Sequence, residues 1–136
     1  MMKQTLRNSV FFMIAFFAAA VSLNASAKVQ KSMTVDATAY NSVPGQTDDD
    51  PWVAAWNNRL RPGQKVIAVS RDLEKHGLTN GAKVKIEGLP GTYTVRDRMN
   101  KRFKNRIDVW MEKDIKKARQ WGKKKLKISW VRPKKK

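Results

Sequence analysis

The sequence predicts a small domain that is mostly β-structure and closes into a barrel. Three observations indicate this fold class. About six short segments are either continuously apolar or alternate apolar and polar residues, as strands do. Residues that favour turns, mainly Gly, Pro and Asn, stand between these segments. A single stretch has a clear helical period, so we expect a barrel with one or two short helices.

Residues 1–27 have the pattern of a cleavable signal peptide. Lys3 and Arg7 precede the apolar run 10–23, and small residues end the segment at Ala27. The alternative is a retained membrane anchor, but a span needs roughly 20 apolar residues, and this run is shorter. We therefore expect cleavage after Ala27, export to the periplasm or the extracellular space, and no integral membrane span after cleavage.

Six segments have the pattern of strands. The segment 66–70 is almost continuously apolar, which is typical of a strand buried on both faces. In the segment 125–131, the apolar residues Leu126, Ile128 and Trp130 share one face. The other predicted strands cover residues 34–40, 82–87, 92–97 and 106–111.

Residues 112–121 are predicted to form a helix. The apolar residues would lie on one face of this helix and the lysines on the opposite face. Gly122 is a typical residue at the C-terminal end of a helix. A second short helix could begin at Asp50, which precedes a proline, and carry Trp52 and Trp56.

The chain is strongly basic. It has 29 Lys and Arg residues against 11 Asp and Glu, which gives a formal net charge of +18 at pH 7. Such a charge attracts polyanions, or it only keeps a small protein soluble. For an exported protein we expect peptidoglycan or another anionic envelope glycan as the partner, and no nucleic acid. The sequence has no cysteine, which excludes disulfides and a lipid-modified N-terminal cysteine.

The length allows one domain rather than two. We expect a linker at residues 28–33, the barrel domain at 34–131 and a basic tail at 132–136. We expect this domain to be a monomer.

Few residue types are available for catalysis. There is no cysteine nucleophile, and the single histidine, His76, has no second histidine for a zinc site. Its position before Gly77 is typical of a turn. Composition alone allows a Ser-His-Asp triad, but the sequence contains neither a nucleophile-elbow motif nor a phosphate-binding glycine loop. We expect no metal and no cofactor, so carboxylates remain as candidates.

Two carboxylates lie within predicted strands. Asp97 has the same parity as Val95, whereas Asp108 has the opposite parity to its apolar neighbours. A carboxylate in an apolar strand must face a cleft or find a partner, because burial alone is costly. The pair could be the acid and the helper of a glycosidic-bond enzyme, or each could pair with a nearby base. The loop between them supplies Arg98, Lys101, Arg102, Lys104 and Arg106.

A third concentration of carboxylates is the run 48–50, which follows Thr47. It lacks the alternating oxygen ligands and the distal Glu of a calcium loop. A solvated loop or a helix cap is the simpler interpretation.

Short motifs in a fixed order cover most of the chain from residue 38 to residue 131. They are Thr38-Ala39-Tyr40, Gly63, Ile67-Ala68-Val69, Gly77, Gly81, Val84, Ile86-Glu87-Gly88, Asp97, Asn105-Arg106-Ile107-Asp108, Ala118-Arg119, Gly122 and the closing strand 125–131. In this order and spacing they resemble the 3D domain, named for three aspartates, of bacterial cell-wall proteins. The resemblance implies a six-stranded double-psi β-barrel, as in the MltA-type lytic transglycosylases and the RlpA-like proteins. It also implies cleavage of peptidoglycan between N-acetylmuramic acid and N-acetylglucosamine.

The resemblance implies roles for individual residues. Asp108 would be the catalytic acid and base, and Asp97 its neighbour in the cleft. Asp108 would protonate the departing glycosidic oxygen and then take the proton of the muramoyl 6-hydroxyl as the 1,6-anhydro ring closes. The expected substrate-binding residues are Thr38, Tyr40, Thr47, Asp48, Ser70, Arg98, Asn105 and Arg106.

The sequence departs from this family in its cleft residues. Ser70 stands where the family has its first aspartate, and Asp72 follows two residues later. The basic segment 98–104 replaces a glycine-rich loop, and Ala54 or Ala55 stands where the family has an early threonine of the cleft. Bases that crowd Asp108 would lower its pKa, whereas bases that point outward could hold an anionic glycan or peptide stem. Phe103 could stack on a sugar or pack in the core. The alternative function is therefore a non-catalytic module of the same fold that binds cell-wall glycan.

Overall fold

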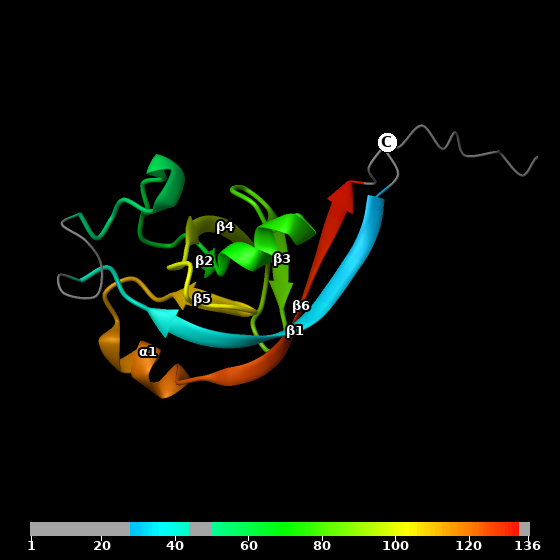
Figure 1. Ribbon diagram of the computed structural model, residues 1–136. Helices are drawn as coiled ribbons and strands as arrows, with labels where there is room; N and C mark the ends of the chain where they lie inside the picture. The colour runs from blue at the N-terminus through cyan, green and yellow to red at the C-terminus, as the bar shows by residue number, and fades with distance from the viewer. Residues whose placement is uncertain (1–27, 44–49, 134–136) are drawn as a thin grey trace, which may run out of the picture.

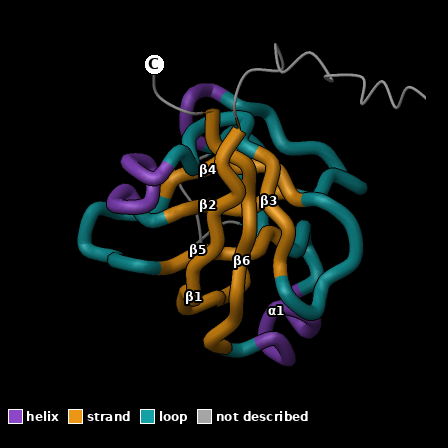
Figure 2. The backbone as a smooth tube through the Cα atoms, turned by 90° about the vertical axis from the view of Figure 1, so that its right-hand side faces the viewer, coloured by secondary structure: helices purple, strands orange, loops and turns teal. Residues whose placement is uncertain are grey.

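The computed structural model describes residues 28–43 and 50–133, and in it six strands form a closed barrel (Figures 1 and 2). The strands are β1 (Lys28–Tyr40), β2 (Val66–Val69), β3 (Lys83–Ile86), β4 (Tyr93–Arg98), β5 (Arg106–Trp110) and β6 (Lys124–Pro133). Around the barrel they follow the order β1-β5-β2-β4-β3-β6. The expected signal peptide and the residues Thr47 and Asp48 lie outside the described residues.

Two parallel pairs define the topology. β1 runs parallel to β5 and β2 runs parallel to β4, whereas the other neighbouring pairs are antiparallel. Parallel neighbours cannot be joined by a tight hairpin, so the chain crosses over and the strands of its two halves interleave. This is the six-stranded double-psi β-barrel that the resemblance implied, and the prediction of a mainly β fold is confirmed.

The barrel interior is filled from the inward faces of the strands. Ile67, Ile107 and Ile128 are fully buried there, at 0% exposure. A second apolar cluster outside the barrel contains Val66 and Trp110. β2 therefore has apolar cover on both faces, which explains the continuous run of apolar residues in its sequence.

β1 and β6 are longer than the sequence predicted. The expected linker 28–33 is part of β1, because its backbone pairs with β6 up to the partners Lys28 and Pro133. In Figure 1 the start of β1 and the end of β6 leave the barrel together as a two-stranded arm. Alternation of side chains is weak in this arm, because both of its faces are largely exposed.

The helices are shorter than the sequence predicted. The helix α1 (Ile115–Trp121) begins after residue 112, because Glu112 has φ +53° and the side chain of Asp114 caps the helix by accepting a hydrogen bond from the Lys117 N–H at 3.0 Å. In Figure 2 this helix lies at one end of the barrel.

Two 3₁₀ helices complete the fold. Near Asp50, where a second short helix was expected, there is only the turn η1 (Ala55–Asn57), which Trp56 interrupts with φ +55°. The helix η2 (Arg71–His76), which was not predicted, ends at Gly77 with φ +93°. In the described parts of the chain, no helix has the length and apolar character needed to cross a bilayer.

Candidate functional site

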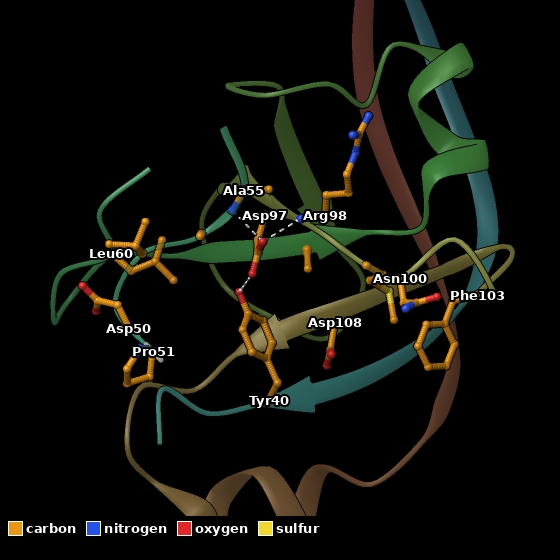
Figure 3. Close-up of a pocket in the computed structure, with 14 residues that line it drawn as sticks. Tyr40, Asp50, Pro51, Ala55, Leu60, Asp97, Arg98, Asn100, Phe103 and Asp108 are labelled. Carbon is orange, nitrogen blue, oxygen red and sulfur yellow. Dashed lines mark hydrogen bonds between the residues drawn. The ribbon is translucent and has the colours of Figure 1, made fainter. Parts of the chain in front are cut away.

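A cleft of about 800 Å³ lies on the outer face of the barrel (Figure 3). Its lining includes one residue from each of four neighbouring strands, namely Tyr40 of β1, Asp108 of β5, Ala68 of β2 and Asp97 of β4. The segment 50–60 forms one side of the cleft, and residues 98–103 form another. Both carboxylates that the sequence singled out therefore open into one cleft.

Ala68 separates the two carboxylates. It is the register partner of Asp97 on β4 and of Asp108 on β5. The two acids therefore stand two strand spacings apart, at about 10 Å between their Cα atoms. Because the side chain between them is a single methyl group, the space between the carboxylates stays open.

An irregularity between β2 and β4 turns Asp97 toward the cleft. Ile67 pairs with Val95, but the next residue, Ala68, pairs with Asp97, so that Arg96 is an extra residue in β4. Val95 is fully buried in the barrel. With regular alternation Asp97 would face the core as Val95 does, and the extra residue reverses this. The shared parity of the two residues in the sequence was therefore misleading.

Asp97 is held by three hydrogen-bond donors. Its Oδ1 accepts from the backbone N–H groups of Ala55, at 2.9 Å, and Arg98, at 2.8 Å. Its Oδ2 accepts from the Tyr40 hydroxyl at 2.9 Å (Figure 3). Asp97 thus ties the segment 50–60 to the barrel.

Asp108 has a different environment. Burial raises its pKa from 3.8 to about 6, and the negative charge of Asp97 acts in the same direction. A hydrogen bond from the Thr38 hydroxyl to its Oδ1, at 3.1 Å, and the charge of Arg106 partly oppose this shift. Asp108 therefore exchanges its proton near neutral pH, as a general acid and base should.

Tyr40 serves as a donor in this site. Burial raises the pKa of its hydroxyl well above 10, and the charges of Asp97 and Asp108 and the hydrogen bond to Asp97 raise it further. The hydroxyl therefore stays protonated at all ordinary pH values. Together, Tyr40 and Thr38 orient the two carboxylates, and the structure brings both of these predicted residues into the site.

Among the described residues, the basic loop makes no ion pair with Asp97 or Asp108. The Arg98 side chain turns away from Asp97 and makes two hydrogen bonds to Glu74, and the charge of Lys104 acts on Asp72. Between described residues, the ion pairs join Arg98 to Glu74 and Lys123 to Asp36. Phe103 lines the cleft rather than the core.

Two expected binding residues lie away from the cleft. Ser70 is fully buried, and its hydroxyl accepts the Arg106 N–H at 3.0 Å. Asn105, with φ +49°, donates its N–H to Asp72 at 2.9 Å and its side-chain amide to the Thr34 carbonyl at 3.2 Å. These contacts hold the loop before β5, and Asp72 is used there rather than in the cleft.

Sequence reasoning missed two contributors. The Ala55 N–H that binds Asp97 belongs to the backbone, so no residue type marks it. Ala68 was noted only within an apolar strand and the motif Ile67-Ala68-Val69, because its place between the acids depends on the pairing of β2 with both β4 and β5.

Replacing Ser70 with Asp, the residue that the family resemblance gives for this position, should not place a carboxylate in the cleft. Because Ser70 is buried beside Asp72, the substitution Ser70→Asp should lower the free energy of unfolding by about 2–4 kcal/mol. Ser70→Ala, which loses only the hydroxyl, should cost about 1 kcal/mol. Urea unfolding of both variants checks this, and an Asp variant as stable as the wild type would refute the placement of this residue.

The described residues contain no cluster of three or more His, Asp or Glu side chains that could hold a metal ion.

One comparison with known proteins bears on the fold. Neither a protein-family model nor a curated protein matches the chain. The crystal structure of an apo-expansin from Clavibacter michiganensis is 17% identical, with 78% of this chain and 53% of the expansin chain covered and a TM-score of 0.51. A mutant of that expansin in complex with cellohexaose is 16% identical, with 77% and 51% covered and a TM-score of 0.43. The chain thus spans about half the length of these structures, and the first likeness supports the barrel fold.

Proposed function

We propose that the protein binds a strand of cell-wall glycan in the cleft between the segment 50–60 and residues 98–103. The observation that carries this proposal is the pair of cleft carboxylates, Asp97 and Asp108, neither of which makes an ion pair with a described Lys or Arg residue. Carboxylate oxygens accept hydrogen bonds from sugar hydroxyls, and each can accept more bonds than it receives here. The volume of about 800 Å³ is within the range of sites that hold small ligands.

The other cleft residues suit the faces of sugar rings. Pro51, Leu60 and Phe103 supply apolar surface at the sides of the cleft. The strong positive charge of the chain would favour approach to an anionic wall polymer. We also propose that a signal peptide at residues 1–27 directs export and that the domain is related to the 3D-domain proteins.

Filling the floor of the cleft should weaken glycan binding. In Ala68→Leu the added side chain would occupy the space between Asp97 and Asp108, so we expect at least about tenfold weaker binding to purified sacculi, measured by sedimentation. Gln120→Leu adds the same side chain at an exposed position of α1 and should bind as the wild type does. Equal binding by the wild type and both variants would exclude this cleft as the site.

Cleavage of the glycosidic bond is a second candidate function, and the raised pKa of Asp108 favours it. A carboxylic acid with a pKa of about 6 keeps a useful fraction of its proton near neutrality. Protonated Asp108 would donate this proton to the departing glycosidic oxygen. Ionised Asp108 would then accept the proton of the muramoyl 6-hydroxyl, whose oxygen closes the 1,6-anhydro ring.

Asp97 would assist without transferring a proton. Three hydrogen-bond donors hold its carboxyl group in place, and a negative charge held there would stabilise the positive charge that develops on the sugar ring. Because the 6-hydroxyl of the sugar is the nucleophile, this reaction needs no second base to activate water.

A further inference from the structure

Two arginines and one aromatic residue form a cluster at the side of the cleft. Phe103 lines the cleft, and the guanidinium carbons of Arg102 and Arg106 lie 4.6 Å and 4.8 Å from the centre of its ring. Figure 3 shows Phe103 on the side remote from Asp50 and Pro51. We call Arg102, Phe103 and Arg106 the arginine cluster.

Backbone contacts hold the cluster in place. The side-chain oxygen of Asn100 accepts the Arg102 N–H at 3.0 Å, and its backbone carbonyl accepts the Phe103 N–H at 3.0 Å. The Arg106 N–H donates to the buried hydroxyl of Ser70. The turn 100–103 and the start of β5 are therefore fixed before any ligand arrives, which lowers the entropy cost of binding.

The charges of the cluster are available to a ligand. Within residues 28–43 and 50–133, the ion pairs join Arg98 to Glu74 and Lys123 to Asp36, so neither arginine of the cluster is paired with a carboxylate. A guanidinium that packs against an aromatic ring by its face keeps its N–H groups free along its edge. This edge matches the two oxygens of a carboxylate.

We infer that the arginine cluster binds a carboxylate carried by the glycan, and that the protein therefore selects acidic sugars over neutral ones. This inference rests on the proposed glycan binding and names the chemical group that Arg102 and Arg106 recognise. Two arginines held beside one aromatic ring favour a planar, bidentate ligand, whereas lysines would provide only point charges.

A bound carboxylate would also act on Asp108. The described groups that influence this acid are the Thr38 hydroxyl, Arg106, Asp97 and Tyr40 on the neighbouring strand β1. Of these, Arg106 is the one whose charge would be neutralised by the ligand. Since Arg106 lowers the pKa of Asp108, neutralising it would raise that pKa, and the acid would keep its proton to higher pH when an acidic sugar is bound.

A matched pair of ligands tests the inference. The probes are the disaccharide N-acetylglucosaminyl-N-acetylmuramic acid and the same disaccharide with its lactyl carboxylate converted to an amide. We expect the wild type to bind the acid about tenfold more tightly by calorimetry. Arg102→Gln and Arg106→Gln should each reduce this preference to about twofold. Lys104→Gln removes the same charge from the same loop but faces Asp72, and it should keep the full preference.

A second measurement follows the pKa of Asp108 itself, so it requires neither a comparison of affinities nor catalytic activity. Carbon-detected NMR of the Asp108 carboxyl should show a higher pKa with the acidic disaccharide bound than with its amide. In the free protein, Arg106→Gln should also raise this pKa. Equal affinity for the two disaccharides would overturn the inference and leave glycan binding intact. Failure of both disaccharides to bind would remove the proposed function and the inference with it.

Discussion

Replacing Asp108 with Asn should abolish any cleavage of peptidoglycan while leaving glycan binding in place. Asparagine keeps the size of the side chain and can still accept the hydrogen bond of Thr38, but it cannot transfer a proton. General acid and base catalysis contributes about 10²–10⁴ in rate, so the release of 1,6-anhydro muropeptides from sacculi should fall by at least about a hundredfold. Mass spectrometry of the digest measures this loss.

The pH dependence of the wild type provides the control. If protonated Asp108 is the acid, activity should fall about tenfold for each pH unit above the pKa of about 6.

Sedimentation with sacculi should persist in Asp108→Asn. A wild type that binds sacculi in a salt-sensitive way but releases no anhydro product would exclude cleavage and leave the binding module as the function.

The same substitution should stabilise the protein at high pH. Burial raises the pKa of Asp108 from 3.8 to about 6 in the folded state, so the folded protein holds the proton more tightly than the unfolded chain. The cost of ionising this residue therefore appears as the pH rises from about 4 to 6 and is complete above pH 6. Asp108→Asn should gain about 1–3 kcal/mol at pH 8 and nothing at pH 3.5, as measured by urea unfolding.

Replacing Asp97 with Ala should destabilise the protein more than any other change in the cleft. The substitution leaves the Tyr40 hydroxyl and the N–H groups of Ala55 and Arg98 without their acceptor. We expect a loss of about 2–4 kcal/mol in the free energy of unfolding. Amide exchange in the segment 50–60 should also accelerate, because Asp97 ties this segment to β4.

Asp114→Ala is the matched control for this result. It also removes a carboxylate that accepts a backbone hydrogen bond, but at the start of α1 rather than in the cleft. It should cost about 1 kcal/mol and leave exchange in the segment 50–60 unchanged. If Asp97→Ala were no more harmful than Asp114→Ala, the role of Asp97 as an anchor would be wrong.

The parts of the fold that the sequence could predict are those governed by local patterns. The apolar run of β2 correctly indicated burial on both faces, because barrel core and outer cluster both contact it. The start of α1 was predicted too early, since nothing in the sequence marks the left-handed conformation of Glu112. The double-psi connectivity came from the resemblance, because alternation within a strand does not specify its neighbours.

The candidate site was predictable in its acids but not in its geometry. Asp97 and Asp108 stood out because a carboxylate is unusual in an apolar strand. The sequence shows Asp97 and Val95 with the same parity but does not show the extra residue in β4 that puts them on opposite faces. Ser70 and Asn105 were expected in the cleft by motif position, but their contacts with Arg106 and Asp72 use them within the loop before β5.

The most direct test of the account is to locate glycan binding on the surface. A disaccharide of peptidoglycan should be titrated into ¹⁵N-labelled protein while the backbone amides are followed by NMR. We predict shifts at Ala55, Arg98 and Asp108, which face the cleft, and their loss in Ala68→Leu. Shifts confined to the basic residues of α1 and β6, or unchanged in Ala68→Leu, would contradict the central claim that the cleft binds glycan.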